Sequence, residues 1–168
     1  MISQIKKILF ATDLSKNSAY AFYHAIHMAK RDEAKIVILH AVEPFPDMLI
    51  AFEDFVDRVA KDRSEDAAKT IKDRLQEFSQ KVDARMGISS VDFVCKTIIR
   101  PGDPVEEILK AVDEEGCDVI VLGTHGKGFL EQTFLGSVSS SVLLRTRKPV
   151  FVIPLPYEDT NTDLIWTE

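Results

Sequence analysis

The feature of this sequence that most constrains its fold is the regular alternation of β-rich runs with segments of helical period. Several of the β-rich runs are apolar throughout, which predicts strands covered on both faces, as in a parallel sheet. Between these runs, apolar residues recur every three or four positions, as on the buried face of a helix. The expected strands cover residues 6–11, 35–42, 91–99, 118–123 and 149–153, and the expected helices cover residues 19–29, 52–82 and 105–112 and a segment that begins at 136.

This alternation predicts right-handed crossovers and an α/β fold. The expected architecture is a five-stranded parallel doubly wound sheet with strand order 3-2-1-4-5, a flavodoxin/Rossmann-like three-layer sandwich. Turn residues support it, because Asp103 and Pro104 suit the first positions of the third helix and Gly116 suits its end. A ligand is expected where the chain reverses direction across the sheet, at the carboxyl ends of the first and fourth strands.

The composition suits a single domain with a full core, since 45% of the 168 residues are hydrophobic. We expect this domain to span 1–154 and an acidic tail to follow at 155–168. The formal net charge is −6, and four acidic residues lie in the tail, which has no Lys or Arg. No basic block is present that could neutralise a run of phosphates, which argues against nucleic-acid binding.

The opening of the chain predicts a cytoplasmic protein that makes no contact with membranes. Its charged residues are followed by only a short apolar run that ends at Thr12, too short for a signal peptide or a membrane span. Cys95 and Cys117 each lie in or beside a β-branched run. We therefore predict two buried, reduced thiols rather than a redox or metal pair.

A glycine-rich segment after the fourth expected strand carries most of the functional information. It reads VLGTHGKG at 121–128 and LGSVSSS at 135–141, with a helix beginning at Gly136. Glycines let main-chain N–H groups approach an anion, and a helix start offers further unpaired N–H donors, so the segment suits phosphates. It is not a Walker A loop, because Lys127 is followed by glycine. From these residues alone, a plain turn and an anion site both remain open.

The spacing Gly123-x2-Gly126-x9-Gly136-Ser137 resembles the nucleotide-binding signature of universal stress proteins of the ATP-binding subgroup. Other segments resemble strands of the same family, namely KILFATDLS at 7–15, ILHAV at 38–42, DVIVLG at 118–123 and KPVFVIP at 148–154. The resemblance covers the chain from about residue 6 to residue 154.

The resemblance implies a binding site for ATP that can be placed residue by residue. Thr12 and Asp13, after the first strand, would contact the nucleoside, with the carboxylate holding ribose hydroxyls. The backbone of Ala41 would meet the adenine edge, and Leu122 and Gly123 would flank the sugar and the α-phosphate. N–H or hydroxyl groups would face the phosphates at the remaining positions, which are Gly126, Gly136, Ser137, Val138 and Ser139, with His125 and Lys127 nearby. Mg²⁺ would be carried in by the phosphates.

Two of these residues, Asp13 and His125, could instead have structural roles. Asp13 could cap the first helix together with Ser15, a role that is compatible with ligand contact. His125 is expected to be a loop residue rather than a catalyst, because no carboxylate at a readable position orients it. Without a general base, any hydrolysis of ATP is predicted to be slow.

Two other functions of this fold class are disfavoured. A phosphoryl-accepting receiver domain needs Asp after the third strand and Lys after the fifth, where this chain has IRP at 99–101 and PLP at 154–156. An adenylate-forming hydrolase needs a glycine-rich loop after the first strand, and ATDLS at 11–15 lacks glycine. We therefore predict an ATP-binding regulatory protein of the stress response, acting on an unnamed protein partner. The alternative is a nucleotide-free interaction module of the same fold.

The last expected strand predicts self-association. The segment 149–154, PVFVIP, is short, apolar and bounded by prolines, and unpaired strand edges invite a partner. The family resemblance implies that two copies pair these strands antiparallel in a twofold homodimer. The alternative is an edge covered by the chain's own tail, which contains Leu164, Ile165 and Trp166.

Overall fold

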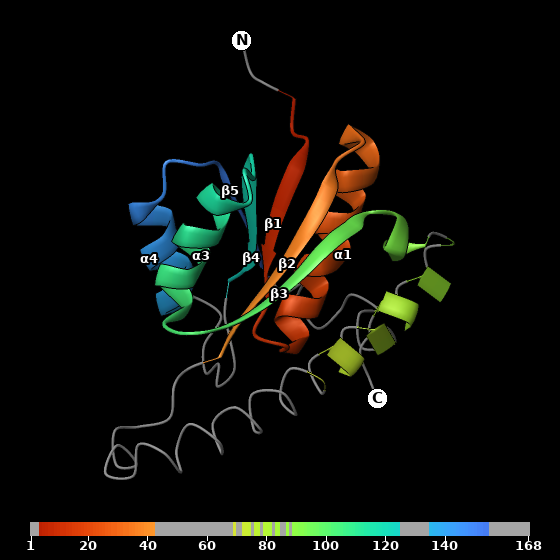
Figure 1. The fold of residues 1–168 in the computed structure, drawn as a ribbon, viewed down its shortest axis with the longest axis horizontal. Helices are drawn as coiled ribbons and strands as arrows, with labels where there is room; N and C mark the ends of the chain where they lie inside the picture. The colour runs from red at the N-terminus through yellow and green to blue at the C-terminus, as the bar shows by residue number, and fades with distance from the viewer. Residues whose placement is uncertain are drawn as a thin grey trace.

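The structure is a computed structural model, which describes residues 4–42, 69, 72–74, 76–77, 79–81, 83–84, 87, 89–124 and 135–154. One sheet forms the centre, with helices on both of its faces (Figure 1). Its strands are β1 (Lys7–Ala11), β2 (Lys35–Val42), β3 (Val94–Pro101), β4 (Val119–Gly123) and β5 (Val150–Ile153). The helices are α1 (Lys16–Asp32), α3 (Pro104–Glu114) and α4 (Ser137–Arg145), with a short 3₁₀ turn, η2 (Ser90–Asp92).

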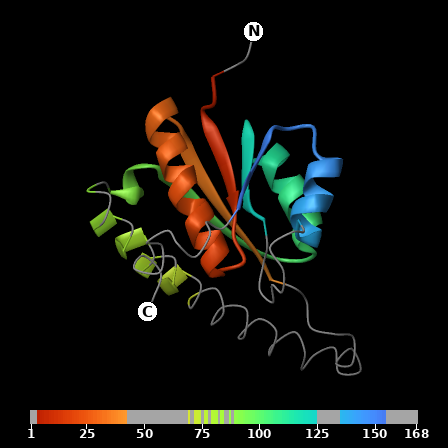
Figure 2. The same cartoon turned by 180° about the vertical axis from the view of Figure 1, so that it is seen from behind.

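The strand order is β3-β2-β1-β4-β5, and every neighbouring pair is parallel. This confirms the predicted fold. Phe10 lies opposite both Ile38 of β2 and Val121 of β4, so β1 occupies the middle of the sheet. Helix α1 covers one face, whereas α3 and α4 cover the other, as the two opposite views show (Figures 1 and 2).

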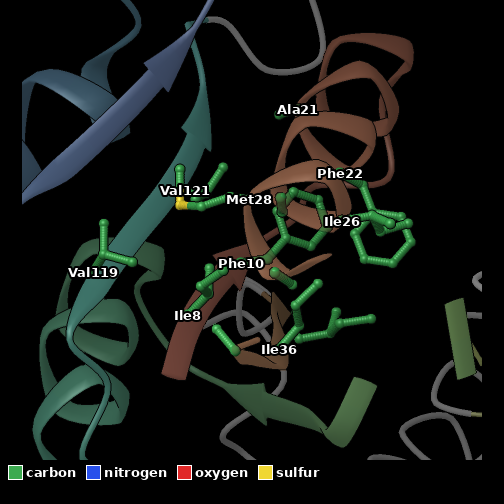
Figure 3. Close-up of a cluster of buried hydrophobic side chains, with 13 residues drawn as sticks. Ile8, Phe10, Ala21, Phe22, Ile26, Met28, Ile36, Val119 and Val121 are labelled. Carbon is green, nitrogen blue, oxygen red and sulfur yellow. The ribbon is translucent and has the colours of Figure 1, made fainter. Parts of the chain in front are cut away.

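Alternate residues of the strands supply the core on the α1 side of the sheet. Phe10 of β1 packs on Phe22 of α1 with ring centroids 4.9 Å apart, and Val121 and Met28 lie against the same cluster (Figure 3). Because side chains alternate along a strand, the neighbouring residues face the other helices. There Leu9, Val37, Leu39, Ile120 and Leu122 pack with Val105, Ile108, Ala111, Val112 and Val142.

The third helix begins and ends where its turn residues predict. The Asp103 carboxylate accepts a hydrogen bond of 3.0 Å from the Glu106 N–H, and Pro104 is the first helical residue. After the helix, Gly116 has a φ of +62°, a conformation that favours glycine. These local signals place α3 as expected, between β3 and β4.

The third strand differs from the prediction, because it runs from Val94 to Pro101 rather than over 91–99. The Ser90 N–H donates to the Asp83 carboxylate at 2.6 Å, and Ser90 begins the 3₁₀ turn η2. Val91 lies in this turn and is 75% exposed, so its β propensity is not supported by packing. Of the long second helix predicted over 52–82, the described residues such as 72–74 and 79–81 are helical. The remaining positions, and the whole tail 155–168 with its domain boundary, lie outside the described residues.

The prediction of two buried thiols is wrong for Cys95. Cys117 is fully buried beside β4, and this burial raises the pKa of its thiol to about 11. Cys95 is exposed, as are Lys96 and Thr97, because β3 is an edge strand. Apolar surroundings in the sequence could not distinguish a central strand from an edge. Among the described helices, none has the length and hydrophobicity that crossing a bilayer requires.

The two thiols are therefore expected to differ in reactivity. Cys95 should react with a thiol reagent in the native protein, whereas Cys117 should react only on unfolding, since it is buried and only a thiolate attacks. Timed labelling followed by mass spectrometry of the peptides measures both rates, with urea-unfolded protein as the control. Equal rates in the native protein would contradict the burial of Cys117.

Candidate functional site

The candidate site lies at the carboxyl ends of β1 and β4, which are neighbours in the sheet. After β1 the chain forms β2 and β3 on one side of the sheet, and after β4 it forms β5 on the other side. The connections that follow β1 and β4 therefore lead in opposite directions. The turn after β1 begins at Thr12 and Asp13, and the turn after β4 begins at Thr124. The structure therefore brings together the first-strand and fourth-strand residues that the sequence predicted as one site.

The turn from β1 to α1 is held by the side chain of Thr12. Its Oγ1 accepts a hydrogen bond of 3.0 Å from the Leu14 N–H and another from the Ser18 hydroxyl. Thr12 is only 9% exposed, and Leu14 adopts a left-handed φ of 65°. A non-glycine residue in this conformation is strained and persists where its surroundings hold it. The position of the neighbouring Asp13 is accordingly well defined.

Asp13 supports the helix start but is not its cap. The N-cap is Ser15, whose Oγ accepts a hydrogen bond of 3.2 Å from the Ser18 N–H. The Asp13 Oδ1 accepts a hydrogen bond of 3.0 Å from the Ser15 N–H. Asp13 thus lies two residues before the N-cap and is half-buried just beyond the end of β1.

The end of β4 is tied directly to the first turn of α4. The Gly136 N–H donates to the Thr124 carbonyl at 2.7 Å, and the Ser139 hydroxyl donates to the Gly123 carbonyl at 2.7 Å. Thr124 and Gly136, the described residues of this contact, are therefore adjacent in space. Among the predicted phosphate contacts, His125, Gly126 and Lys127 lie outside the described residues.

The N–H groups at the start of α4 have no hydrogen-bond acceptor among the residues that the structure describes. Gly136 is the N-cap and has no side chain with which to cap the helix, and the first turn holds no acidic residue. The first intrahelical bond runs from the Ser140 N–H to the Gly136 carbonyl at 2.9 Å. The N–H groups of 137–139 precede it, so they are available to an anion and carry the partial positive charge of the helix end.

Ser137 and Ser139 in the first turn of α4 differ in the groups that they can offer to a ligand. Ser137 is exposed, so its hydroxyl is accessible to a ligand. Ser139 is 5% exposed and its hydroxyl is committed to Gly123, so only its main-chain N–H is suited to the predicted contact. Val138 is half-buried and packs toward the core on the α3 side.

A close approach between β4 and α1 explains the glycine at position 123. A Cβ atom there would lie 3.1 Å from Nδ2 and 3.2 Å from Cγ of Asn17. Asn17 is 4% exposed, and its Nδ2 lies 3.5 Å from the Thr124 hydroxyl. Sequence reasoning missed Asn17. Asn17 could have been found as a polar residue in the first turn of a helix that begins beside the predicted ligand site.

His40 and Ala41 close the site on the β2 side. The His40 Nδ1 lies 2.7 Å from the Thr12 carbonyl oxygen, a contact between two strands that the sequence did not predict. Ala41 is half-buried and follows directly. Leu122, by contrast, is 3% exposed and packs in the core with α3 and α4, so only its backbone borders the site.

His24 and His27 lie away from this edge, on α1. His27 is exposed, and His24 is half-buried with its ring 4.8 Å from that of Tyr20. Burial, together with the neighbouring His27, lowers the pKa of His24. Within the described part of the chain, no three His, Cys, Asp or Glu side chains are grouped as a metal site requires.

A model of the Universal stress protein family matches residues 4–154, a span that contains every element described above. The chain belongs to the universal stress protein family. Universal stress protein MJ0577 of Methanocaldococcus jannaschii is 28% identical over 162 residues, covering 88% of this chain and 94% of its own length. A universal stress protein of Thermus aquaticus is 33% identical over 148 residues, covering 88% and 98%.

Solved structures of universal stress proteins share the fold. That of MJ0577 has a TM-score of 0.72 at 27% identity and covers 92% of this chain and 99% of that chain. A universal stress protein in complex with cAMP has a TM-score of 0.58 at 22% identity and covers 90% of this chain and 98% of that chain. The latter likeness concerns the fold alone.

The hydrogen bond from Ser139 to Gly123 is expected to stabilise the junction of β4 and α4. Ser139→Ala would leave the Gly123 carbonyl without this donor and lower the free energy of unfolding by about 1–2 kcal/mol. Urea denaturation measures the change. Ser141→Ala, at a half-buried position of the same helix, serves as the control and should change stability by less than about 0.5 kcal/mol. Equal losses in both variants would mean that the bond contributes nothing specific.

Proposed function

We propose that this universal stress protein binds ATP across the carboxyl ends of β1 and β4 and acts as a regulatory protein of the stress response. The observation that carries the proposal is the uncapped start of α4, fixed to the end of β4 and next to the turn that holds Asp13. A helix start of this kind binds phosphate through main-chain N–H groups. A carboxylate in the adjacent turn suits the hydroxyls of a ribose.

The distribution of charge supports this orientation of the nucleotide. The phosphates would meet the N–H groups of Ser137, Val138 and Ser139, since the Gly136 N–H is already donated to the Thr124 carbonyl. The predicted residues His125, Gly126 and Lys127 would lie nearby. Asp13 would repel phosphates and therefore belongs at the sugar. The base would then lie toward β2, at Ala41. The universal stress protein solved with cAMP supports the idea that this fold accommodates an adenine nucleotide.

Mg²⁺ would enter with the nucleotide rather than occupy a protein cage. The described residues offer no group of three metal-binding side chains, and Mg²⁺ commonly keeps several waters while it bridges phosphates. The sequence offers no general base for the site, so hydrolysis is expected to be slow. Ordering of the segment 124–135 by ATP would be the signal to a protein partner.

The ATP site is tested by changing the charge at the N-cap of α4. Gly136→Asp keeps a good helix cap but places a carboxylate where the phosphates would lie, so the affinity for Mg-ATP should fall at least tenfold. Gly136→Asn is the matched control, with nearly the same shape and no charge, and should lose much less. Isothermal titration calorimetry measures both variants against the parent protein.

Two results would contradict the ATP proposal. One is a parent protein that gives no heat with Mg-ATP and releases no adenine compound when it is denatured. The other is equal affinity in the parent and in Gly136→Asp. Amide exchange in 124–135 that does not change on addition of ATP would favour the alternative, a nucleotide-free interaction module of the same fold.

We further propose that two copies pair through β5, because the two edges of the sheet differ in character. The β3 edge carries charges held by α3, with Lys96 Nζ 2.7 Å from a Glu115 carboxylate oxygen and Arg100 Nη2 2.7 Å from a Glu114 carboxylate oxygen. Such charges protect an edge from pairing. β5 has no charged residue, and its Phe151 is 42% exposed.

Phe151→Lys should weaken the homodimer, because it places a charge in the middle of the proposed interface. Sedimentation velocity at micromolar concentration should show a dimer for the parent and a shift to monomer for the variant. Val91→Lys, at an exposed position next to the other edge, is the control and should remain dimeric. A monomeric parent at this concentration would overturn the proposal.

A further inference from the structure

His40 is the one polar residue in the middle of the β2 segment ILHAV at 38–42, and its ring reaches across to β1. Its Nδ1 lies 2.7 Å from the main-chain oxygen of Thr12. A carbonyl oxygen only accepts hydrogen bonds, so Nδ1 carries the proton and donates. The half-buried ring is therefore held in one tautomer by Thr12, the first residue after β1.

The Thr12 carbonyl oxygen is also the acceptor that the next hydrogen bond between β1 and β2 would use. The Thr12 N–H donates to the Leu39 carbonyl at 2.9 Å. In a parallel ladder the following bond would run from the Ala41 N–H to the Thr12 carbonyl. Instead, the pairing of β1 with β2 stops at Ala11 opposite Leu39, and the Thr12 oxygen is occupied by His40.

The main chain of Ala41 consequently extends past the end of β1. On its other side, β2 stays paired with β3 as far as Val42 opposite Pro101, and the Val42 carbonyl accepts from the Gly102 N–H at 2.9 Å. Successive residues of a strand direct their main-chain groups to opposite sides. Since Val42 directs its groups toward β3, Ala41 directs its groups toward the candidate site beyond β1.

We propose that His40 is a positioning residue for the adenine base: by occupying the Thr12 carbonyl it ends the β1–β2 ladder and leaves the main-chain N–H and C=O of Ala41 for the base. Adenine suits such a pair, because its N1 accepts a hydrogen bond beside an amino group that donates one. This inference rests on the proposed ATP site. In this role His40 does not contact the ligand itself and acts through the main chain of Ala41.

The substitution that tests this role is His40→Leu, which removes the donor and keeps an apolar side chain. The freed Thr12 carbonyl should then accept from the Ala41 N–H, so NMR-detected amide exchange of Ala41, fast in the nucleotide-free parent, should slow at least tenfold. A merely structural role for His40 would instead speed exchange around the site. His40→Asn should behave like the parent, since the Asn Nδ2 is placed as Nδ1 of histidine is. His27→Asn, at an exposed position of α1, is the matched control.

Ligand binding provides the second readout. His40→Leu should bind ATP about tenfold more weakly, as the loss of one or two hydrogen bonds to the base implies, while the affinity for inorganic tripolyphosphate stays unchanged. His40→Asn should regain most of the ATP affinity. Exchange at Ile38 and Val121 in the core verifies that each variant is folded.

The outcomes separate this inference from the proposed function. Equally slow exchange of Ala41 in the parent and in His40→Leu, a parent-like ATP affinity in His40→Leu, or an ¹⁵N spectrum with the His40 proton on Nε2 alone would each overturn it. A parent that binds no ATP would overturn the proposed function and the adenine assignment together. In that case the exchange of Ala41 still decides whether His40 ends the ladder.

Discussion

The rest of the structure depends on the burial of β1 on both faces and its pairing on both edges. Ile8, Leu9 and Phe10 are at most 1% exposed, and they contact α1 on one side of the sheet and α3 on the other. Because β1 is central, the other strands are added on both of its sides, first β2 and β3 and then β4 and β5. The divergence of these two halves leaves the carboxyl ends of β1 and β4 open to a ligand.

The polar groups at this edge hold one another in place before any ligand arrives. Thr12 anchors the turn into α1, and Ser139 and Gly136 anchor the start of α4 to the end of β4. All of these bonds lie near a strand end that the core already fixes. A ligand that bound here would meet donors with little freedom left to lose, which lowers the entropic cost of binding.

An anion site in a chain of net charge −6 requires a local source of positive potential. Main-chain N–H groups at the start of α4 provide one that does not depend on the side-chain charge balance. The composition of the helix start supports this, since the first turn of α4 has no acidic residue. Overall charge therefore says little about this site, although it bears on nucleic-acid binding, which needs many basic side chains.

The sequence by itself determined the positions of α1, α3 and α4 and the family, because periodicity, turn residues and glycine spacing are local signals. It also predicted the strand order, because the alternation of strands and helices restricts how a parallel sheet can be connected. It further predicted that Asp13, Gly123 and the start of α4 lie at one edge of the sheet, since the carboxyl ends of neighbouring parallel strands meet there. Only the tertiary structure decided what depends on neighbours across the sheet. It exposed Cys95 by placing β3 at an edge, committed the Ser139 hydroxyl to Gly123, brought Asn17 against β4 and joined His40 to Thr12. These contacts join residues as far as 107 positions apart, and no local pattern encodes which partner a side chain will meet.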